Sequence, residues 1–233
     1  MPYSNIKLIS FDLDNTLYDN QPVIALADQR SEEYLSQEFK KQNKKFNYSK
    51  LKLIKKELLL LQQKDVDKFK YENLSKLRKD ALLIFCDELK QQTSIAQKAF
   101  DIFLSFRSKV EIEAEIKELL IRLSNKCQLV SVTNGNCDAK KLSIGELFVK
   151  NYSPSEGYRA KPHPQMLNQI FVDFKLKPEQ VLHIGDRDDS DGLAAKKAGC
   201  FYYQFDPFTN GNLDKGLLIK LLQDLKMKYR NTL

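Results

Sequence analysis

Short apolar runs alternate with longer amphipathic stretches over much of the chain. Residues 6–12 form an apolar run that ends in an acidic residue, a pattern typical of a buried strand that reaches a sheet edge. Similar runs predict strands at residues 128–133, 181–185 and 201–205, and residues 148–152 predict a weaker fifth strand. Apolar side chains also recur at helical spacing in two stripes, namely Ile112, Ile116, Leu119, Leu120 and Leu123, and Met166, Leu167, Ile170, Phe171 and Phe174.

The order of these elements predicts an α/β fold. Strands and helices alternate from about residue 111, which is typical of a Rossmann-like, doubly wound parallel sheet with helices on both faces. In such a sheet the ligand site lies outside the carboxyl ends of the strands. Towards the end of the chain, residues 206–216 predict turns and residues 217–229 predict a terminal amphipathic helix.

Residues 20–105 interrupt the alternation. This stretch holds periodic leucines, no glycine and a single proline, Pro22, so it predicts an inserted all-helical domain of about four helices. We therefore expect an α/β core domain of residues 1–18 and 106–233, and a helical domain of residues 19–105. Because the insertion follows the first strand directly, we expect the helices to cover that strand's carboxyl end.

Composition and cysteine usage limit the class of protein. The 233 residues are 42% hydrophobic and 30% charged, which suits a globular chain with a sizeable core. The longest aliphatic run, residues 58–61, is far shorter than the roughly 20 apolar residues of a membrane-spanning helix, and no signal pattern opens the chain. Four scattered cysteines without a CxxC spacing favour reduced thiols. We expect a cytoplasmic protein that does not bind membranes.

The net charge of +7 arises mainly in one stretch. Residues 40–80 hold 14 Lys and Arg against 5 Asp and Glu, whereas residues 1–39 hold 2 against 7. The basic stretch also carries leucines at helical spacing, which favours a solvated helix face. The alternative is a surface for an anionic ligand or nucleic acid, but this distribution does not favour nucleic acid as a partner.

Several strand ends carry residues suited to phosphate chemistry. Asp12 and Asp14 can face one small volume, and two close carboxylates call for a divalent cation, although an acidic loop would also fit. Thr133 and Asn134 present a hydroxyl and backbone amides where a phosphate could bind. Lys161 precedes a proline and so lies on a stiff loop. The predicted strand at residues 181–185 is followed by four carboxylates, those of Asp186, Asp188, Asp189 and Asp191.

These pieces occur in the order and strand context of the haloacid dehalogenase superfamily, which the chain resembles over nearly its whole length. The four motifs are FDLDNTLY at residues 11–18, SVTNG at 131–135, KPHP at 161–164 and IGDRDDSD at 184–191. The helical insert between the first two motifs is similar to the cap of the family's first cap class. Four ordered motifs and an insert in the matching place are far more specific than any one motif.

The resemblance implies a reaction and a set of roles. Asp12 would be the nucleophile that forms an aspartyl phosphate, and Asp14 the general acid and base. Mg²⁺ would be held by the Asp12 carboxylate, the Asp14 backbone carbonyl and Asp186. Further roles are implied for five residues: Thr133, the Asn134 amide and Lys161 would bind the phosphate oxygens, Thr16 would brace the first loop, and Asp191 would support the site.

The fourth motif departs from the usual spacing. The second acidic residue of the motif commonly stands four or five positions after the first, and here these positions are Ser190 and Asp191. Asp191 is favoured and Asp189 is the alternative. Arg187 replaces a frequent small residue, so we expect it to contact the helical domain or to pair with Asp188. The two histidines, His163 and His183, are interpreted as a loop residue and a strand-filling residue.

Asp14 distinguishes branches of this superfamily, because its founding dehalogenases need neither an acid at that position nor a metal. The sequence therefore favours a Mg²⁺-dependent phosphomonoester hydrolase that acts on a small phosphorylated metabolite, a nucleotide or a sugar phosphate. The alternatives are a phosphomutase of the same fold and a non-catalytic protein that binds a phosphorylated ligand or nucleic acid.

Overall fold

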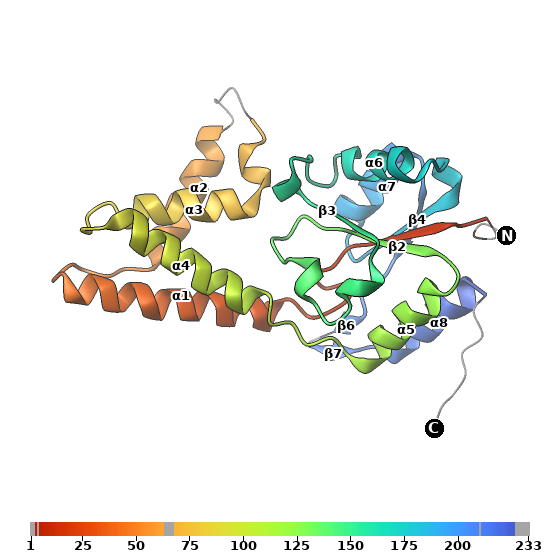
Figure 1. The fold of residues 1–233 in the computed structure, drawn as a ribbon, viewed down its shortest axis with the longest axis horizontal. Coiled ribbons are helices and arrows are strands. Elements are labelled where there is room, and N and C mark those ends of the chain that lie inside the picture. The colour runs from red at the N-terminus through yellow and green to blue at the C-terminus, as the bar shows by residue number, and fades with distance from the viewer. Residues whose placement is uncertain (1–2, 4, 63–67, 210, 227–233) are drawn as a thin grey trace. The chain divides into compact units, whose positions relative to one another are not determined.

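The computed structural model divides into two compact units (Figure 1). The structure describes residues 3, 5–62, 68–209 and 211–226. One unit comprises Met1–Asn20 and Val110–Leu233, and the other comprises Gln21–Lys109. Among the described residues, no helix is long and apolar enough to cross a membrane.

A five-stranded parallel sheet forms the centre of the first unit. Its strands stand in the order β3-β2-β1-β4-β5, and each neighbouring pair is parallel. The predicted parallel sheet is therefore confirmed, and the weak fifth strand is present as a three-residue edge strand. The strands are β1 (Leu8–Phe11), β2 (Gln128–Val132), β3 (Lys150–Tyr152), β4 (Val181–Gly185) and β5 (Phe201–Gln204).

Side chains alternate between the two faces of this sheet, and a hydrophobic cluster covers each face. Ile9 and Phe11 belong to the cluster that includes α5 (Ala114–Ser124) and α8 (Lys215–Asp224). Leu8 belongs to the cluster that includes α6 (Gln165–Phe174) and α7 (Leu193–Ala198). Helices therefore cover both faces, as the two apolar stripes predict.

Shorter elements connect these helices and strands. Residues 206–216, predicted as turns, also contain a small antiparallel hairpin. The terminal helix α8 ends at Asp224, and residues 227–229 of the longer predicted helix lie outside the described residues. The short elements are β6 (Phe208–Thr209), β7 (Asn212–Leu213), the π-helical turn η7 (Asp188–Gly192), and the 3₁₀ turns η3 (Ala139–Lys141), η4 (Gly145–Leu147), η5 (Pro154–Glu156) and η6 (Pro178–Gln180).

The second unit is all-helical within its described residues. It contains α1 (Gln21–Lys41), α2 (Ser49–Leu61), η2 (Lys70–Glu72), α3 (Leu74–Phe85) and α4 (Gln92–Arg107). In α1 the buried residues recur every four positions, which places them on one face of the helix: Ala27, Ser31, Leu35 and Phe39. That face packs against α4, and aromatic contacts that include Phe39 with Phe85 fill the core of the bundle.

Candidate active site

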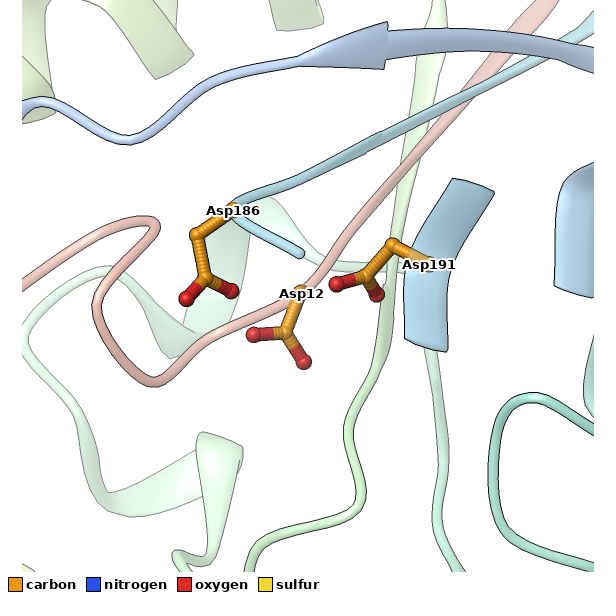
Figure 2. A group of neighbouring side chains, drawn as sticks. All are labelled: Asp12, Asp186 and Asp191. Atoms are coloured by element: carbon orange, nitrogen blue, oxygen red, sulfur yellow. The ribbon is translucent and has the colours of Figure 1, made fainter. Parts of the chain in front are cut away.

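Three carboxylates meet at the carboxyl ends of two adjacent strands. Asp12 directly follows β1 and Asp186 directly follows β4, and the strands end side by side because Phe11 pairs with Ile184. Asp191, from η7, joins them so that one ligand atom from each carboxylate lies within 4.8 Å of the others. Figure 2 shows the three side chains gathered at this point. An all-oxygen donor set of this kind suits a hard cation such as Mg²⁺.

Lys161 reaches this cluster from the loop before α6. Its Nζ donates to Oδ1 of Asp12 at 2.6 Å, to Oδ1 of Asp191 at 2.5 Å and to the Val132 carbonyl at 2.6 Å. The Asn134 side chain fixes the lysine backbone, because its Oδ1 accepts from the Lys161 N–H and its Nδ2 donates to the Lys161 carbonyl, both at 2.8 Å. The ammonium is therefore held between the two carboxylates from a braced loop.

Burial controls the charge of these groups. It raises the pKa of Asp12 to about 7, although the Lys161 ammonium acts in the opposite direction. Burial and the neighbouring Asp191 carboxylate raise the pKa of Asp186 to about 6. Burial would also raise the pKa of Asp191, but the ammonium of Lys161 holds it below its ordinary value. Asp12 and Asp186 therefore share a site in which a further positive charge would be favourable.

Asp14 lies on the turn that follows Asp12 and is fixed by a tyrosine. The buried Tyr18 hydroxyl donates to Oδ1 of Asp14 at 2.5 Å, while the turn is closed by the Asn15 N–H bonding the Tyr18 carbonyl. Gly135 permits the approach of the second motif, because a Cβ there would lie 2.4 Å from Oδ2 of Asp14. The Asp14 carboxylate does not belong to the three-carboxylate group, and the expected contribution of its backbone carbonyl stays a prediction.

The two threonines singled out from the sequence are buried beside these loops. The Thr133 hydroxyl accepts from the Gly135 N–H at 2.9 Å, which helps to shape the turn of the second motif. Thr16 donates to Oδ1 of Asp186 at 3.4 Å, so it contacts the fourth motif as well as lying in the first loop. The expected binding of phosphate by Thr133 and the expected bracing of the first loop by Thr16 stay predictions.

The acidic residues of the fourth motif differ in burial and in bonding partner. The Arg187 carbonyl accepts the N–H groups of Ser190, Asp191 and Gly192, and this tight turn directs Asp191 into the buried cluster. Asp189 is exposed instead, and it pairs with the Arg187 guanidinium through contacts of 2.9 and 2.7 Å. Arg187 therefore pairs with Asp189 in place of Asp188, which was one of its two expected partners, and the other expectation, a contact with the helical domain, stays a prediction.

Sequence reasoning missed three polar residues that bond to this machinery. Tyr18 contacts Asp14, and His183 contacts Asp191 with its Nε2 at 2.9 Å from Oδ1. Ser10 in turn lies 2.9 Å from Nδ1 of His183. The available signal was the placement of a serine and a histidine within two otherwise apolar strands, because buried polar groups need partners.

Comparisons with known proteins place this site in context. A family model described as haloacid dehalogenase-like hydrolase matches residues 6–199. The 5-amino-6-(5-phospho-D-ribitylamino)uracil phosphatase YigB of Escherichia coli (strain K12) is 24% identical over 201 residues, which are 85% of this chain and 82% of that protein.

Two solved structures extend the comparison. The 2-haloacid dehalogenase of Pseudomonas syringae pv. Tomato DC3000 is 26% identical, with a TM-score of 0.77 and 87% of each chain covered. The magnesium-bound HAD-hydrolase YfnB of Bacillus subtilis is 19% identical, with a TM-score of 0.59, 96% of this chain covered and 100% of that chain. The second likeness is one of fold.

Proposed function

Because the chain belongs to the haloacid dehalogenase-like hydrolases and is a phosphatase of that family, we propose that it hydrolyses a small phosphomonoester through a covalent intermediate on Asp12. The observation that carries the proposal is the position of Asp12, buried at the end of β1 and bonded to Lys161 beside Asp186. A nucleophile needs a nearby cation in order to approach a phosphate dianion.

The first step transfers the phosphoryl group to the protein. A carboxylate oxygen of Asp12 attacks phosphorus while the bond from phosphorus to the ester oxygen breaks, and Asp14 donates its proton to the departing alkoxide. In the second step the Asp14 carboxylate takes a proton from water, and the resulting hydroxide attacks the same phosphorus. The bond from phosphorus to Asp12 breaks, which releases inorganic phosphate and restores the nucleophile.

Three further groups are assigned to the phosphate oxygens. Lys161 is buried, and although burial disfavours its charge, Asp12 and Asp191 raise its pKa above the ordinary value. It therefore remains a cation beside the reacting oxygen. Thr133 and the backbone amide of Asn134 complete the set, at the end of the adjacent strand β2.

The donor set at the strand ends fits Mg²⁺, because it is composed of carboxylate oxygens, and burial, which raises the pKa of Asp12 and of Asp186, leaves their negative charges poorly solvated without a cation. We propose these two carboxylates and the Asp14 backbone carbonyl as its ligands. When bound, the ion neutralises charge between the nucleophile and the phosphate. Asp191 already accepts from Lys161 and His183, so its role is to support the site.

The presence of Asp14 favours phosphate ester hydrolysis over dehalogenation. An alkoxide leaving group needs a proton and the attacking water needs a base, whereas halide departure needs no acid. Asp14 is held in place by Tyr18, as such a role requires. We further propose that the helical unit of Gln21–Lys109 acts as a cap that selects the substrate. We assign the substrate to the class of nucleotides and sugar phosphates.

Hydrolysis of p-nitrophenyl phosphate tests the proposal. We expect inorganic phosphate release that needs Mg²⁺, stops with a chelator and is lost in Asp12→Asn, whereas the matched control Asp189→Asn keeps the wild-type rate. A panel of nucleotides, sugar phosphates and ribityl phosphates then ranks natural substrate classes by kcat/KM. Absence of turnover on every member of the panel would overturn the proposal in favour of a binding role. Isomerisation of a sugar phosphate without phosphate release would overturn it in favour of a mutase.

A further inference from the structure

Two polar side chains lie within the apolar face of the sheet that α6 and α7 cover. Ser10 on β1 and His183 on β4 are register partners, and neither side chain has any solvent exposure. Their neighbours on this face are mostly apolar and include Leu8, Val181 and the ring of Tyr202, which pairs with His183 in register. A serine and a histidine placed there lose their hydration, so the arrangement is costly unless each polar atom is bonded.

The bonds form a continuous chain from this face to the reacting groups. Ser10 Oγ lies 2.9 Å from His183 Nδ1, and His183 Nε2 lies 2.9 Å from Oδ1 of Asp191. Oδ1 of Asp191 also accepts from Lys161 at 2.5 Å, and Lys161 donates to Asp12 at 2.6 Å. Each residue in the chain therefore fixes the position of the next.

The contacts define which nitrogen of His183 carries the proton. Oδ1 of Asp191 accepts from the Lys161 ammonium at 2.5 Å and Oδ2 accepts from the Arg187 N–H at 3.2 Å, so this carboxylate meets His183 as an acceptor. Nε2 is then the donor, and Nδ1 accepts from the Ser10 hydroxyl. Burial lowers the pKa of His183 below its ordinary value, so the ring is neutral and this single tautomer satisfies both contacts.

We propose that His183 is a positioning residue: Ser10 holds the ring by donating to Nδ1, and the Nε2–H of His183 orients Asp191 so that Lys161 is aimed at Asp12. The inference rests on the proposed function for the roles of Lys161 and Asp12. It adds Ser10 and His183, which lie just outside the first and fourth motifs, to the residues that support the reaction. Without the donor at Nε2, the Asp191 carboxylate keeps its contacts to Lys161 and to the Arg187 N–H but loses the one that fixes it from the sheet side.

Four variants separate positioning from mere filling of space. His183→Leu fills the face without a donor, whereas His183→Gln returns an N–H near the position of Nε2. Ser10→Ala removes only the hydroxyl that bonds Nδ1 of His183. Ser31→Ala is the matched control, because Ser31 is a buried serine outside the four motifs whose hydroxyl donates to the Ala99 carbonyl at 3.1 Å and to no residue of this hydrogen-bond chain.

Kinetics on p-nitrophenyl phosphate with Mg²⁺ provide the first readout, at a temperature well below every unfolding midpoint. We expect kcat to fall about 10- to 100-fold in His183→Leu and about tenfold in Ser10→Ala, as is usual when a supporting hydrogen bond is removed from a catalytic group. His183→Gln should recover most of the loss, and Ser31→Ala should keep the wild-type kcat. A wild-type kcat in His183→Leu would overturn the proposal.

Imidazole ¹⁵N spectra give a second readout that does not depend on activity. The chain contains only two histidines, so a His163→Gln variant assigns the signals of His183. We expect a protonated Nε2 and an unprotonated Nδ1 in the wild type. In Ser10→Ala we expect the same tautomer with a shifted Nδ1 signal, because Asp191 still accepts from Nε2 while Nδ1 loses its donor. A protonated Nδ1 in the wild type would overturn the proposal. Inactivity of the wild-type enzyme with the expected tautomer present would count instead against the proposed function.

Discussion

Tyr18 donates a hydrogen bond to Asp14 over 2.5 Å, from a side chain that is 1% exposed. The tyrosine stands four residues after the aspartate, at the end of the first motif, and the turn between them brings its hydroxyl to the Asp14 carboxylate. A carboxyl group that must deliver a proton and then accept one works best in a fixed position. The proposed acid and base is therefore held by a residue from its own loop.

Tyr18→Phe tests this relationship. The phenyl ring keeps the packing, while Asp14 loses the donor that fixes its rotamer. We expect kcat to fall about tenfold with KM within a factor of about two, and the free energy of unfolding to fall by about 1–2 kcal/mol. Steady-state kinetics and urea unfolding measure both. An unchanged kcat would show that the hydroxyl does not position the acid.

Gly135→Ala tests the close approach of the second motif to the first. The new methyl group would lie 2.4 Å from Oδ2 of Asp14, so the carboxylate must move and leave Tyr18. We expect both kcat and stability to fall. In an Asp14→Ala background the collision disappears, so the two substitutions should couple by at least about 1 kcal/mol in urea unfolding. Additive effects of the two substitutions would contradict this geometry.

Asp191→Asn and Asp189→Asn form a matched pair within one turn. Asp191 is buried against Lys161, whereas Asp189 is exposed and bonded to Arg187. We expect Asp191→Asn to lower kcat/KM at least about 100-fold, because Lys161 loses one of its two carboxylate partners. Asp189→Asn should stay within about twofold of the wild type. The opposite ranking would make Asp189 the functional acid of the fourth motif.

Mg²⁺ affinity should depend on pH in a defined direction. The pKa of Asp12 is raised to about 7 and that of Asp186 to about 6, so at pH 5 both carboxyls hold protons that a cation must displace. Affinity should rise between about pH 5 and pH 8, with proton release that is largest at the acidic end. Calorimetry in buffers of different ionisation enthalpy measures both quantities. A constant affinity without proton release would remove these carboxylates from the ligand set.

The sequence was sufficient to predict the sheet and the meeting of the four motifs. Residues at the carboxyl ends of parallel strands converge at one sheet edge, so Asp12 and Asp186 could be expected near one another although the segments are far apart in the chain. The resemblance to the superfamily added Lys161 and Asp191. The alternation of apolar and polar positions also predicted which helices cover the sheet.

Other features depend on details that the periodicity of apolar residues does not specify. The pair of Ser10 and His183 requires the register between two strands that lie more than 170 residues apart. The pairing of Arg187 with Asp189 follows from a π-helical turn, whereas spacing alone suggested Asp188. The Tyr18 contact depends on a rotamer, which a motif does not specify. Each of these features involves a side chain's direction, and the sequence gives its position only.

Trapping the phosphoryl group on Asp12 is the most direct test of the proposed mechanism. The p-nitrophenolate leaving group needs no proton, so an Asp14→Asn variant should complete the first step with Mg²⁺ and then stall without its base. Acid quenching and intact-mass spectrometry should then show one added phosphoryl group per chain, on the peptide that contains Asp12. The absence of any phosphoryl adduct, together with wild-type phosphate release by Asp12→Asn, would contradict the account.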